Sequence, residues 1–256
     1  MSITKLVLRF AAPLPDVEGY DRYLFLGPHP DDIEIGAGAT VAKLAAMGKH
    51  ITFLICTDGR YGLSHAPEGI TPEALVALRQ DESRAAAAKL GVTDVRFLPL
   101  HDGGFYTMDE LCRGVAAVVG DVQPQILFAP DPCVDSECHI DHLRTGEAGR
   151  RIVFAAHSKP IMERLGGRSA PVEAIAYYMT AKPNRFVGTR GYFEKQLEAL
   201  FTCHPSQFPP DIPDSRALRF YLKLRALDFG LRSFKGTAEG FRVLGKTQMH
   251  CLPEAD

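Results

Sequence analysis

One imidazole and two carboxylates, His29, Asp31 and Asp32, stand close together directly after an apolar run. The run, residues 23–26, predicts a buried parallel strand, and a glycine and two prolines end it abruptly. We therefore expect the three side chains on the loop at the carboxyl end of that strand, where ligands bind in open α/β sheets. These residue types suit a divalent metal ion, with one carboxylate left over as a base.

A second group of metal-binding residue types, His139, Asp141 and His142, follows another short apolar run at residues 126–129. Two predicted strand ends thus carry ligand-type side chains. Histidine with carboxylate suits zinc or a similar ion, and three protein ligands leave a coordination position open for water, as catalytic sites require. The expected ligands are His29, Asp32 and His142.

Two structural alternatives compete with this interpretation. Asp31 and Asp32 could instead cap the helix that follows them, because acids are common at helix N-termini. Cys133 and Cys138 could join the two histidines of the second group in a structural zinc site, although their spacing is cramped for a zinc finger. The coincidence of two such groups at two strand ends favours the catalytic interpretation over both.

A different enzyme class is also conceivable, because residues 36–41 begin like the Gly-x-Gly-x-x-Gly fingerprint of dinucleotide-binding oxidoreductases and Asp58 follows about 20 residues later. Two facts oppose it. The third glycine is replaced by Val41, and residues 27–35 separate the predicted strand from Gly36, where such a loop would begin at once. A third option, a non-catalytic sugar-binding or assembly module, would need damage to the two groups, and their sequences show none.

Together the two groups resemble the LmbE/PIG-L family of zinc-dependent N-deacetylases, whose marks are His-Pro-Asp-Asp after the first strand and a downstream His-x-Asp-His. Both marks are intact here, at residues 29–32 and 139–142. The resemblance covers about residues 22 to 208 and includes three further segments. These are Arg79 and Glu82 before Lys89-Leu90-Gly91, the loop at residues 98–103, and residues 195–207 with His204, Ser206 and Gln207. Ala39 and residues 57–60 depart from the family pattern, and the second change concerns the substrate rather than the chemistry.

The resemblance implies a hydrolase of linear amide C–N bonds that removes an N-acetyl group from an amino sugar or related glycosidic conjugate, such as one of N-acetylglucosamine. The ion would be Zn2+, with iron or manganese also compatible with an Asp/His2 site. By analogy, Asp31 would take the proton of the activated water and pass one to the leaving amine. His139 would donate to the oxyanion, with Asp141 orienting it.

The same resemblance makes Asp102 the acid that contacts the sugar. The loop from Arg60 to Ile70 is rich in Gly, His and Pro, so we expect this rim, with Arg60 and Tyr61 at its start, to select the substrate. Other family members imply an alternative activity, an amidase for an acylated antibiotic intermediate or a thiol conjugate. Several members form rings or stacked trimers, which implies a homo-oligomer.

The composition and net charge of the chain indicate which kinds of molecule it binds. The 256 residues are 46% hydrophobic with a formal net charge of -2, so we expect one domain, a small-molecule partner, no nucleic acid and no membrane. The six cysteines form no Cys-x-x-Cys pair, which favours reduced thiols. The apolar stretch in residues 1–17 is too short and interrupted for a signal peptide, so cytoplasmic location is the expectation.

Strand and helix patterns alternate along the chain, which predicts an α/β, Rossmann-like three-layer sandwich with a mostly parallel sheet. The expected strands are residues 23–26, 51–56, 95–98, 126–129 and 174–179. The expected helices are residues 36–47, 71–90, 108–119, 142–156, 191–201 and 216–229. We expect residues 1–20 to form an N-terminal arm, and residues 208–256 to form a C-terminal extension that packs on a neighbouring subunit.

Overall fold

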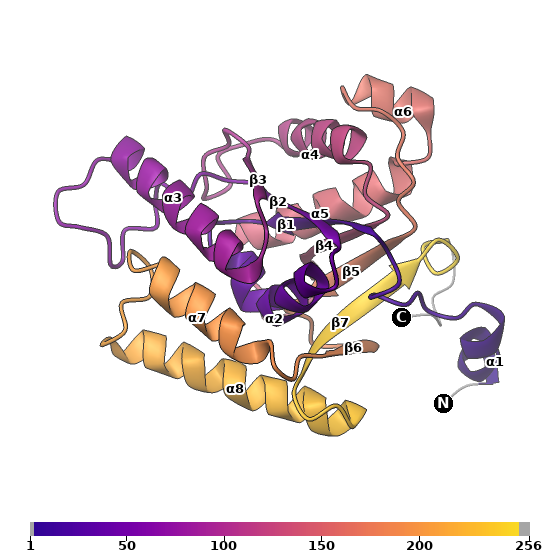
Figure 1. The fold of residues 1–256 in the computed structure, drawn as a ribbon. Coiled ribbons are helices and arrows are strands. Elements are labelled where there is room, and N and C mark those ends of the chain that lie inside the picture. The colour runs from indigo at the N-terminus through magenta and orange to yellow at the C-terminus, as the bar shows by residue number, and fades with distance from the viewer. Residues whose placement is uncertain (1–2, 251–256) are drawn as a thin grey trace.

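The computed structural model describes residues 3–250, so Cys251 lies outside the described part. Within residues 3–250, seven strands form one sheet in the order β3-β2-β1-β4-β5-β7-β6 (Figure 1). The strands are β1 (Arg22–Gly27), β2 (His50–Ile55), β3 (Asp94–Phe97), β4 (Ile126–Pro130), β5 (Ala174–Tyr178), β6 (Arg185–Gly188) and β7 (Ala238–Gly245). Neighbours among β1 to β5 are parallel, and β7 is antiparallel to both β5 and β6. The predicted α/β class with a mostly parallel sheet is confirmed.

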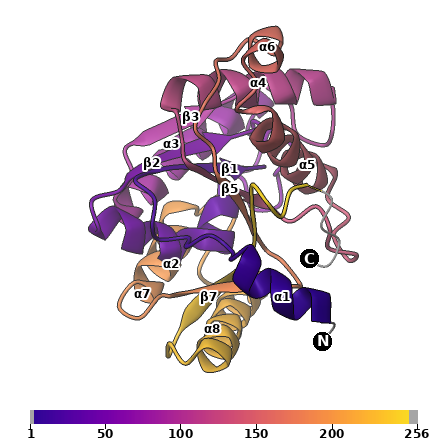
Figure 2. The same ribbon diagram turned by 90° about the vertical axis from the view of Figure 1, so that its right-hand side faces the viewer.

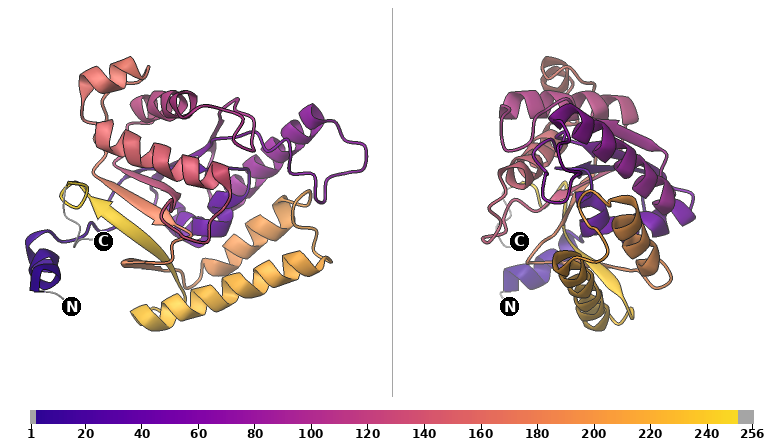
Figure 3. Two further views of the ribbon diagram at one scale, coloured as in Figure 1. Left: turned by 180° about the vertical axis from the view of Figure 1, so that it is seen from behind. Right: turned by 90° about the vertical axis from the view of Figure 1, so that its left-hand side faces the viewer.

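Helices cover both faces of the sheet. They are α1 (Ile3–Ala11), α2 (Asp32–Ala46), α3 (Pro72–Leu90), α4 (Met108–Val122), α5 (Ile140–Ala155), α6 (Lys159–Arg164), α7 (Phe193–Cys203) and α8 (Pro213–Ser233). Helices α2, α3 and α7 lie on one face and α4 and α5 on the other, while α8 runs outside α7 along the edge of the molecule (Figures 1 and 3). None of the helices in the described residues is both long and apolar enough to cross a bilayer.

Alternating side chains on β1 build two cores. Tyr23 and Phe25 belong to the core under α2 and α3, whereas Leu24 and Leu26 belong to the core under α4 and α5. Phe25 stacks on Phe128 of β4, with the ring centroids 4.2 Å apart. Because these two residues are also register partners, the packing fixes β1 beside β4 and aligns their carboxyl ends.

The chain order makes this alignment functionally important. From β1 the chain moves outward through β2 to β3, and it then returns to the other side of β1 with β4. The crossovers on either side of this point lie on opposite faces of the sheet, so the carboxyl ends of β1 and β4 flank a topological switch point. The loops that follow these two strands, with the first turns of α2 and α5, carry the two predicted metal-binding groups.

The sequence pattern predicts that helix α2 begins at Gly36. In the structure α2 begins four residues earlier, at Asp32. The two glycines of the supposed dinucleotide fingerprint therefore lie inside a helix and form no phosphate loop. A Cβ at Gly36 would collide with the ring of Tyr178, and one at Gly38 would come 2.9 Å from the Gln196 side chain. These glycines thus allow α2 to pack closely on β5 and α7, which explains the pattern without a dinucleotide.

Both ends of the chain are more regular than the sequence indicated. The expected N-terminal arm contains helix α1, which stands apart from the two helical layers (Figure 2). Within the expected C-terminal extension, β7 is inserted between β5 and β6, so this segment completes the sheet. Helix α6 and strands β6 and β7 were not predicted.

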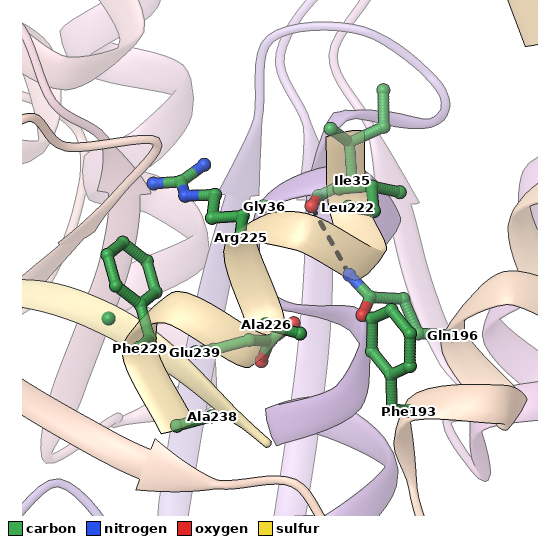
Figure 4. Close-up of a pocket in the computed structure, with 11 residues that line it drawn as sticks. Ile35, Gly36, Phe193, Gln196, Leu222, Arg225, Ala226, Phe229, Ala238 and Glu239 are labelled. Atoms are coloured by element: carbon green, nitrogen blue, oxygen red, sulfur yellow. Dashed lines mark hydrogen bonds between the residues drawn. The ribbon is translucent and has the colours of Figure 1, made fainter. Parts of the chain in front are cut away.

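A carboxylate from β7 reaches the middle of α2 (Figure 4). Glu239 accepts hydrogen bonds from the backbone N–H groups of Ala39, at 3.1 Å, and Thr40, at 2.7 Å. On the preceding turn, the Gln196 side-chain amide of α7 donates to the carbonyl oxygens of Glu34 and Ile35. Helix α2 is therefore bonded to the elements around it through its own peptide groups. We call Glu239 with Ala39, Thr40 and Gln196 the Glu239 site.

Candidate active site

The loop after β1 brings His29 and Asp32 into direct contact. Asp32 Oδ2 lies 3.0 Å from His29 Nδ1 and also accepts the backbone N–H of His29 at 2.9 Å. Both residues are buried, with exposed fractions of 8% and 4%. The other ring nitrogen of His29, Nε2, is 3.1 Å from Asp141 Oδ2, so the imidazole is held from both sides.

The first turn of α5, which follows the loop after β4, adds His142 to this pair. Its Nε2 lies 3.4 Å from Asp32 Oδ1, and its Nδ1 lies 2.9 Å from Glu137 Oε2. Glu137 also accepts the backbone N–H of His139. A carboxylate behind a metal-binding histidine commonly fixes the orientation of the ring. Glu137 was not predicted from the sequence, because its position five residues before His142 matches no ligand spacing.

The three predicted ligands are therefore brought together, and their atoms fit a divalent ion. One donor atom each from His29, Asp32 and His142 lie within 4.8 Å of one another. Ligand atoms of a tetrahedral zinc site are roughly 3.3 Å apart, since each lies about 2.0–2.2 Å from the ion. Burial would lower the pKa of His29, but hydrogen bonds to Asp141 and Asp32 outweigh it and raise the pKa to about 10. The cluster favours positive charge, as a cation site must.

Asp31 occupies a strained position beside the cluster. Its φ of 130° is unusual for any residue other than glycine. Although it stands at the N-terminus of α2, its side chain makes no capping hydrogen bond. Instead Asp31 Oδ2 accepts from Arg79 Nη2 at 3.1 Å. The alternative in which Asp31 serves as a helix cap is therefore not what the structure shows.

Arg79 holds the loop as well as Asp31. Its guanidinium also donates to the carbonyl oxygens of Pro30, at 3.0 Å, and Gly59, at 2.9 Å. Burial raises the pKa of Asp31 to about 6, while the charge of Arg79 opposes this rise. The sequence placed Arg79 only in a family-like helix and gave it no role in the site, because its partners are far away along the chain.

Asp141 is fully buried at the start of α5. Besides its contact with His29, it accepts backbone N–H groups from Gly103 at 2.6 Å and Gly104 at 2.9 Å. Burial would raise the pKa of Asp141, but the hydrogen bonds from His29 and Gly103 outweigh it and lower the pKa to about 2. The expectation paired Asp141 with His139, yet His139 Nδ1 is 3.8 Å from Asp141 Oδ2. The closer partner is His29.

His139 is the N-cap residue of α5, and half of its side chain is exposed. Its Nδ1 accepts the backbone N–H of Asp141 at 3.4 Å, which assigns the proton of the neutral ring to Nε2. Burial lowers the pKa of His139, and the neighbouring His29 and His142 lower it further. A neutral imidazole whose Nε2 is a donor suits the predicted role at a developing oxyanion.

The candidate active site opens into a cavity of about 290 Å3. It is lined by His29, Asp31, Tyr61, Gly62, Arg79, Asp102, Gly103, His139 and Gln207. Asp102 accepts the backbone N–H of Tyr61 and therefore joins the rim loop to the loop after β3. Arg60 lies outside this lining and pairs with Asp58 at 2.9 Å. Tyr61, which was expected to select the substrate together with Arg60, does line the cavity.

Gln207 is another lining residue that received no role from the sequence. Its side-chain amide donates to the carbonyl of Gly62 at 2.9 Å and so ties the C-terminal segment to the rim loop. The neighbouring Ser206 donates to Glu82 of α3 at 2.6 Å, and His204 is fully buried beside Glu34. The similarity of residues 195–207 to a family segment was the available signal for this part of the site.

The remaining alternatives find no support in the geometry. Cys133 and Cys138 are exposed, and neither belongs to a metal-binding group in the described residues. Asp58, the supposed ribose-binding acid, pairs with Arg60 and lies 2.9 Å from His101 Nδ1. The geometry therefore supports neither a structural zinc site at the two cysteines nor a ribose-binding role for Asp58.

Comparison with known proteins identifies a family and several named relatives. A model of the PIG-L family, described as GlcNAc-PI de-N-acetylase, matches residues 24–153. A diacetylchitobiose deacetylase from Thermococcus kodakarensis is 31% identical over 258 residues, which cover 99% of this chain and 93% of the relative. An inositol-linked relative from Kineococcus radiotolerans, 1D-myo-inositol 2-acetamido-2-deoxy-alpha-D-glucopyranoside deacetylase, is 31% identical over 68% of this chain and 56% of its own.

Solved structures extend the likeness to the whole fold. The N,N'-diacetylchitobiose deacetylase from Pyrococcus horikoshii, in complex with its inhibitor MPG, superimposes with a TM-score of 0.87 and 28% identity. The match covers 99% of this chain and 97% of that one. Fold and site together define an α/β protein with a candidate metal centre at the switch point of its sheet. The chain belongs to the PIG-L (LmbE-like) family, which confirms the resemblance carried by its two motifs.

Proposed function

We propose that the protein is a metal-dependent N-deacetylase that acts on an N-acetylated amino sugar or a small conjugate of one. The observation that carries the proposal is the convergence of His29, Asp32 and His142 beside a buried carboxylate, Asp31, which is no part of that cluster. The relatives are deacetylases by name, and the substrates in their names contain N-acetylated glucosamine units. Membership of the family supports transfer of the activity to this chain.

We propose Zn2+ as the ion, held by His29, Asp32 and His142. When bound, it supplies a Lewis acid and an acidified water at neutral pH. Two imidazoles and one carboxylate are a common catalytic zinc set, and iron or manganese would also accept it. Asp141 and Glu137 orient the two imidazoles from behind, which favours a fixed coordination geometry.

The residues around the cluster supply the proton transfers. Asp31 takes the proton of the attacking water and returns one to the amine that leaves, and a pKa of about 6 suits both steps near neutral pH. Arg79 keeps this carboxylate in place. His139 presents its Nε2–H to the oxygen of the amide as negative charge develops there.

Substrate selection falls to the rim. Asp102 and Tyr61 line the cavity, and Tyr61 packs edge-to-face with Phe105, with the ring centroids 5.8 Å apart. A cavity of about 290 Å3 lies at the small end of the usual range for ligand sites, so a larger conjugate would extend over this aromatic rim. Asp102 is placed to bind sugar hydroxyls. Arg60 acts through the rim loop in this proposal, because it faces Asp58.

The test is release of free amine by the zinc-loaded protein from a panel of amides. The panel holds N-acetylglucosamine, N,N'-diacetylchitobiose, an acylated glycopeptide antibiotic and an acylated thiol conjugate. Turnover of the sugar amides supports the proposal. Turnover of the antibiotic or thiol amide alone favours the alternative amidase, and no turnover by a protein that holds one ion per chain contradicts the sugar specificity.

Three further expectations stay predictions for this chain. They are its cytoplasmic location, the lack of a nucleic-acid or membrane partner, and its assembly as a homo-oligomer. Cell fractionation and measurement of molecular mass in solution test the first and the third directly.

A further inference from the structure

Helix α8 is apolar on two opposite sides. Its inner side buries Leu222, Ala226 and Phe229, and Leu222 joins a small core with α7. Its outer side and the residue after its end carry large apolar side chains that are 51–98% exposed. They are Phe220, Leu224, Leu227, Leu231 and Phe234, and Tyr221 is exposed on one flank of this stripe. A contiguous apolar stripe of this kind on a surface marks an interaction site.

The spacing of the stripe identifies the shape of its partner. Within α8 successive members are four, three and four residues apart, and Ala217 precedes Phe220 by three, while Phe234 follows the end of the helix. Alternation of three and four is the heptad repeat by which one helix packs along another. A helix that lies in a membrane surface usually shows a broader apolar face. We call Phe220, Leu224, Leu227, Leu231 and Phe234 the α8 seam.

We infer that the α8 seam binds the α8 seam of a second copy of this chain, with the two helices parallel. Charged residues beside the seam favour a second copy of this chain as the partner and a parallel arrangement of the two helices. Lys223 flanks the seam on one side and Asp228 on the other, five residues later. In a parallel pair of helices, the flank that carries Lys223 faces the flank that carries Asp228, so Lys223 of each copy would meet Asp228 of the other. In an antiparallel pair, the Lys223 flank of one copy would face the Lys223 flank of the other, and the Asp228 flanks would also face each other.

The two charged side chains are available for this contact. Asp228 pairs with Arg232 on its own helix at 3.3 Å, and both groups are about half exposed. Lys223 is exposed and makes no ion pair among residues 3–250 of its own chain. Helix α8 lies along the outside of the molecule over its whole length (Figures 1 and 3). None of its residues lines the active-site cavity, so the inference goes beyond the proposed function.

The test is the molecular mass of the full-length protein in solution, measured by sedimentation over a range of concentrations. The wild type is expected to associate into dimers or larger assemblies. The double variant Leu224→Glu/Leu227→Glu should weaken association by at least ~100-fold, because each charge enters the seam in both copies. Circular dichroism checks that the variant is folded. Ile161→Glu changes a side chain of similar exposure on α6 and should leave association unchanged.

A charge exchange tests the direction. Lys223→Asp and Asp228→Lys should each weaken association by about tenfold, since each creates two like-charge contacts in a symmetric pair. The combined exchange should restore it. A monomeric wild type overturns the inference, as does a seam variant that associates normally. Failure of the exchange to restore association overturns the parallel arrangement, and a monomer that binds anionic vesicles through the seam assigns α8 to a membrane instead.

Discussion

Helix α2 meets buried carboxylates at two places, and their partners differ. At its N-terminus, Asp31 faces Arg79, and Asp32 faces the imidazoles of His29 and His142. At the Glu239 site, in the middle of the helix, Glu239 accepts two peptide N–H groups and is surrounded largely by apolar side chains (Figure 4). The first place offers cationic partners at ion-pair distance, and the second offers chiefly dipoles.

The pKa values follow this difference. Burial would raise the pKa of Asp32, but His142 and His29 outweigh it and hold the pKa well below its usual value. Burial raises the pKa of Glu239 to about 7, and its hydrogen bonds to Thr40 and Ala39, with the charge of Arg225, only partly oppose this rise. Burial alone therefore does not make a functional acid. A cationic counterpart at ion-pair distance keeps a buried carboxylate ionised, and the candidate active site supplies one for Asp32.

The largest expected effect comes from removing the ion. Treatment with a chelator should abolish amine release and lower the melting temperature, because the ion binds the folded cluster and not the unfolded chain. Returning one equivalent of Zn2+ should restore both. Full activity after the metal content has fallen to zero would contradict the proposal that the cluster at the N-terminus of α2 acts through a metal ion.

A smaller loss is expected when the oxyanion donor is removed. His139→Ala should lower kcat by about 10²–10³-fold with little change in KM, as is typical for the loss of one such donor. Metal content should be unchanged, because His139 is not a predicted ligand. A rise in KM alone, with kcat preserved, would assign His139 to substrate binding instead.

The Glu239 site predicts a pH dependence of stability. Its pKa is about 7 in the folded protein against 4.5 as the ordinary value, so folding takes up a proton between these pH values. The contribution of Glu239 to the free energy of unfolding should therefore be most favourable below pH 4.5 and fall as the pH rises to 7, by on the order of 3 kcal/mol at most. Glu239→Gln should flatten that slope in chemical denaturation.

Glu163→Gln is the matched control, since Glu163 lies exposed on α6. It should leave the slope as in the wild type. A Glu239→Gln protein that loses stability equally at pH 5 and pH 8 would show that the carboxyl group remains ionised throughout, like the acids of the active site.

The sequence indicated the three candidate metal ligands because each belongs to a compact motif between a predicted strand and the helix that follows it. The same logic could not reach Arg79, Glu137 or Gln207, whose partners are joined to them only by folding. Strand β7 was missed for a related reason. Its sequence places Glu239 and Arg242 among apolar residues, and both become acceptable in a central strand only through partners elsewhere in the chain.

The most direct test of the account compares two neighbouring variants, Asp31→Asn and Asp32→Asn. Metal content and amine release from N,N'-diacetylchitobiose are measured together on each. We predict that Asp31→Asn retains one ion per chain while its turnover falls by at least ~10²-fold, whereas Asp32→Asn loses both. Loss of the ion from Asp31→Asn, or retained turnover in it, would contradict the division of one base and three ligands on which the account depends.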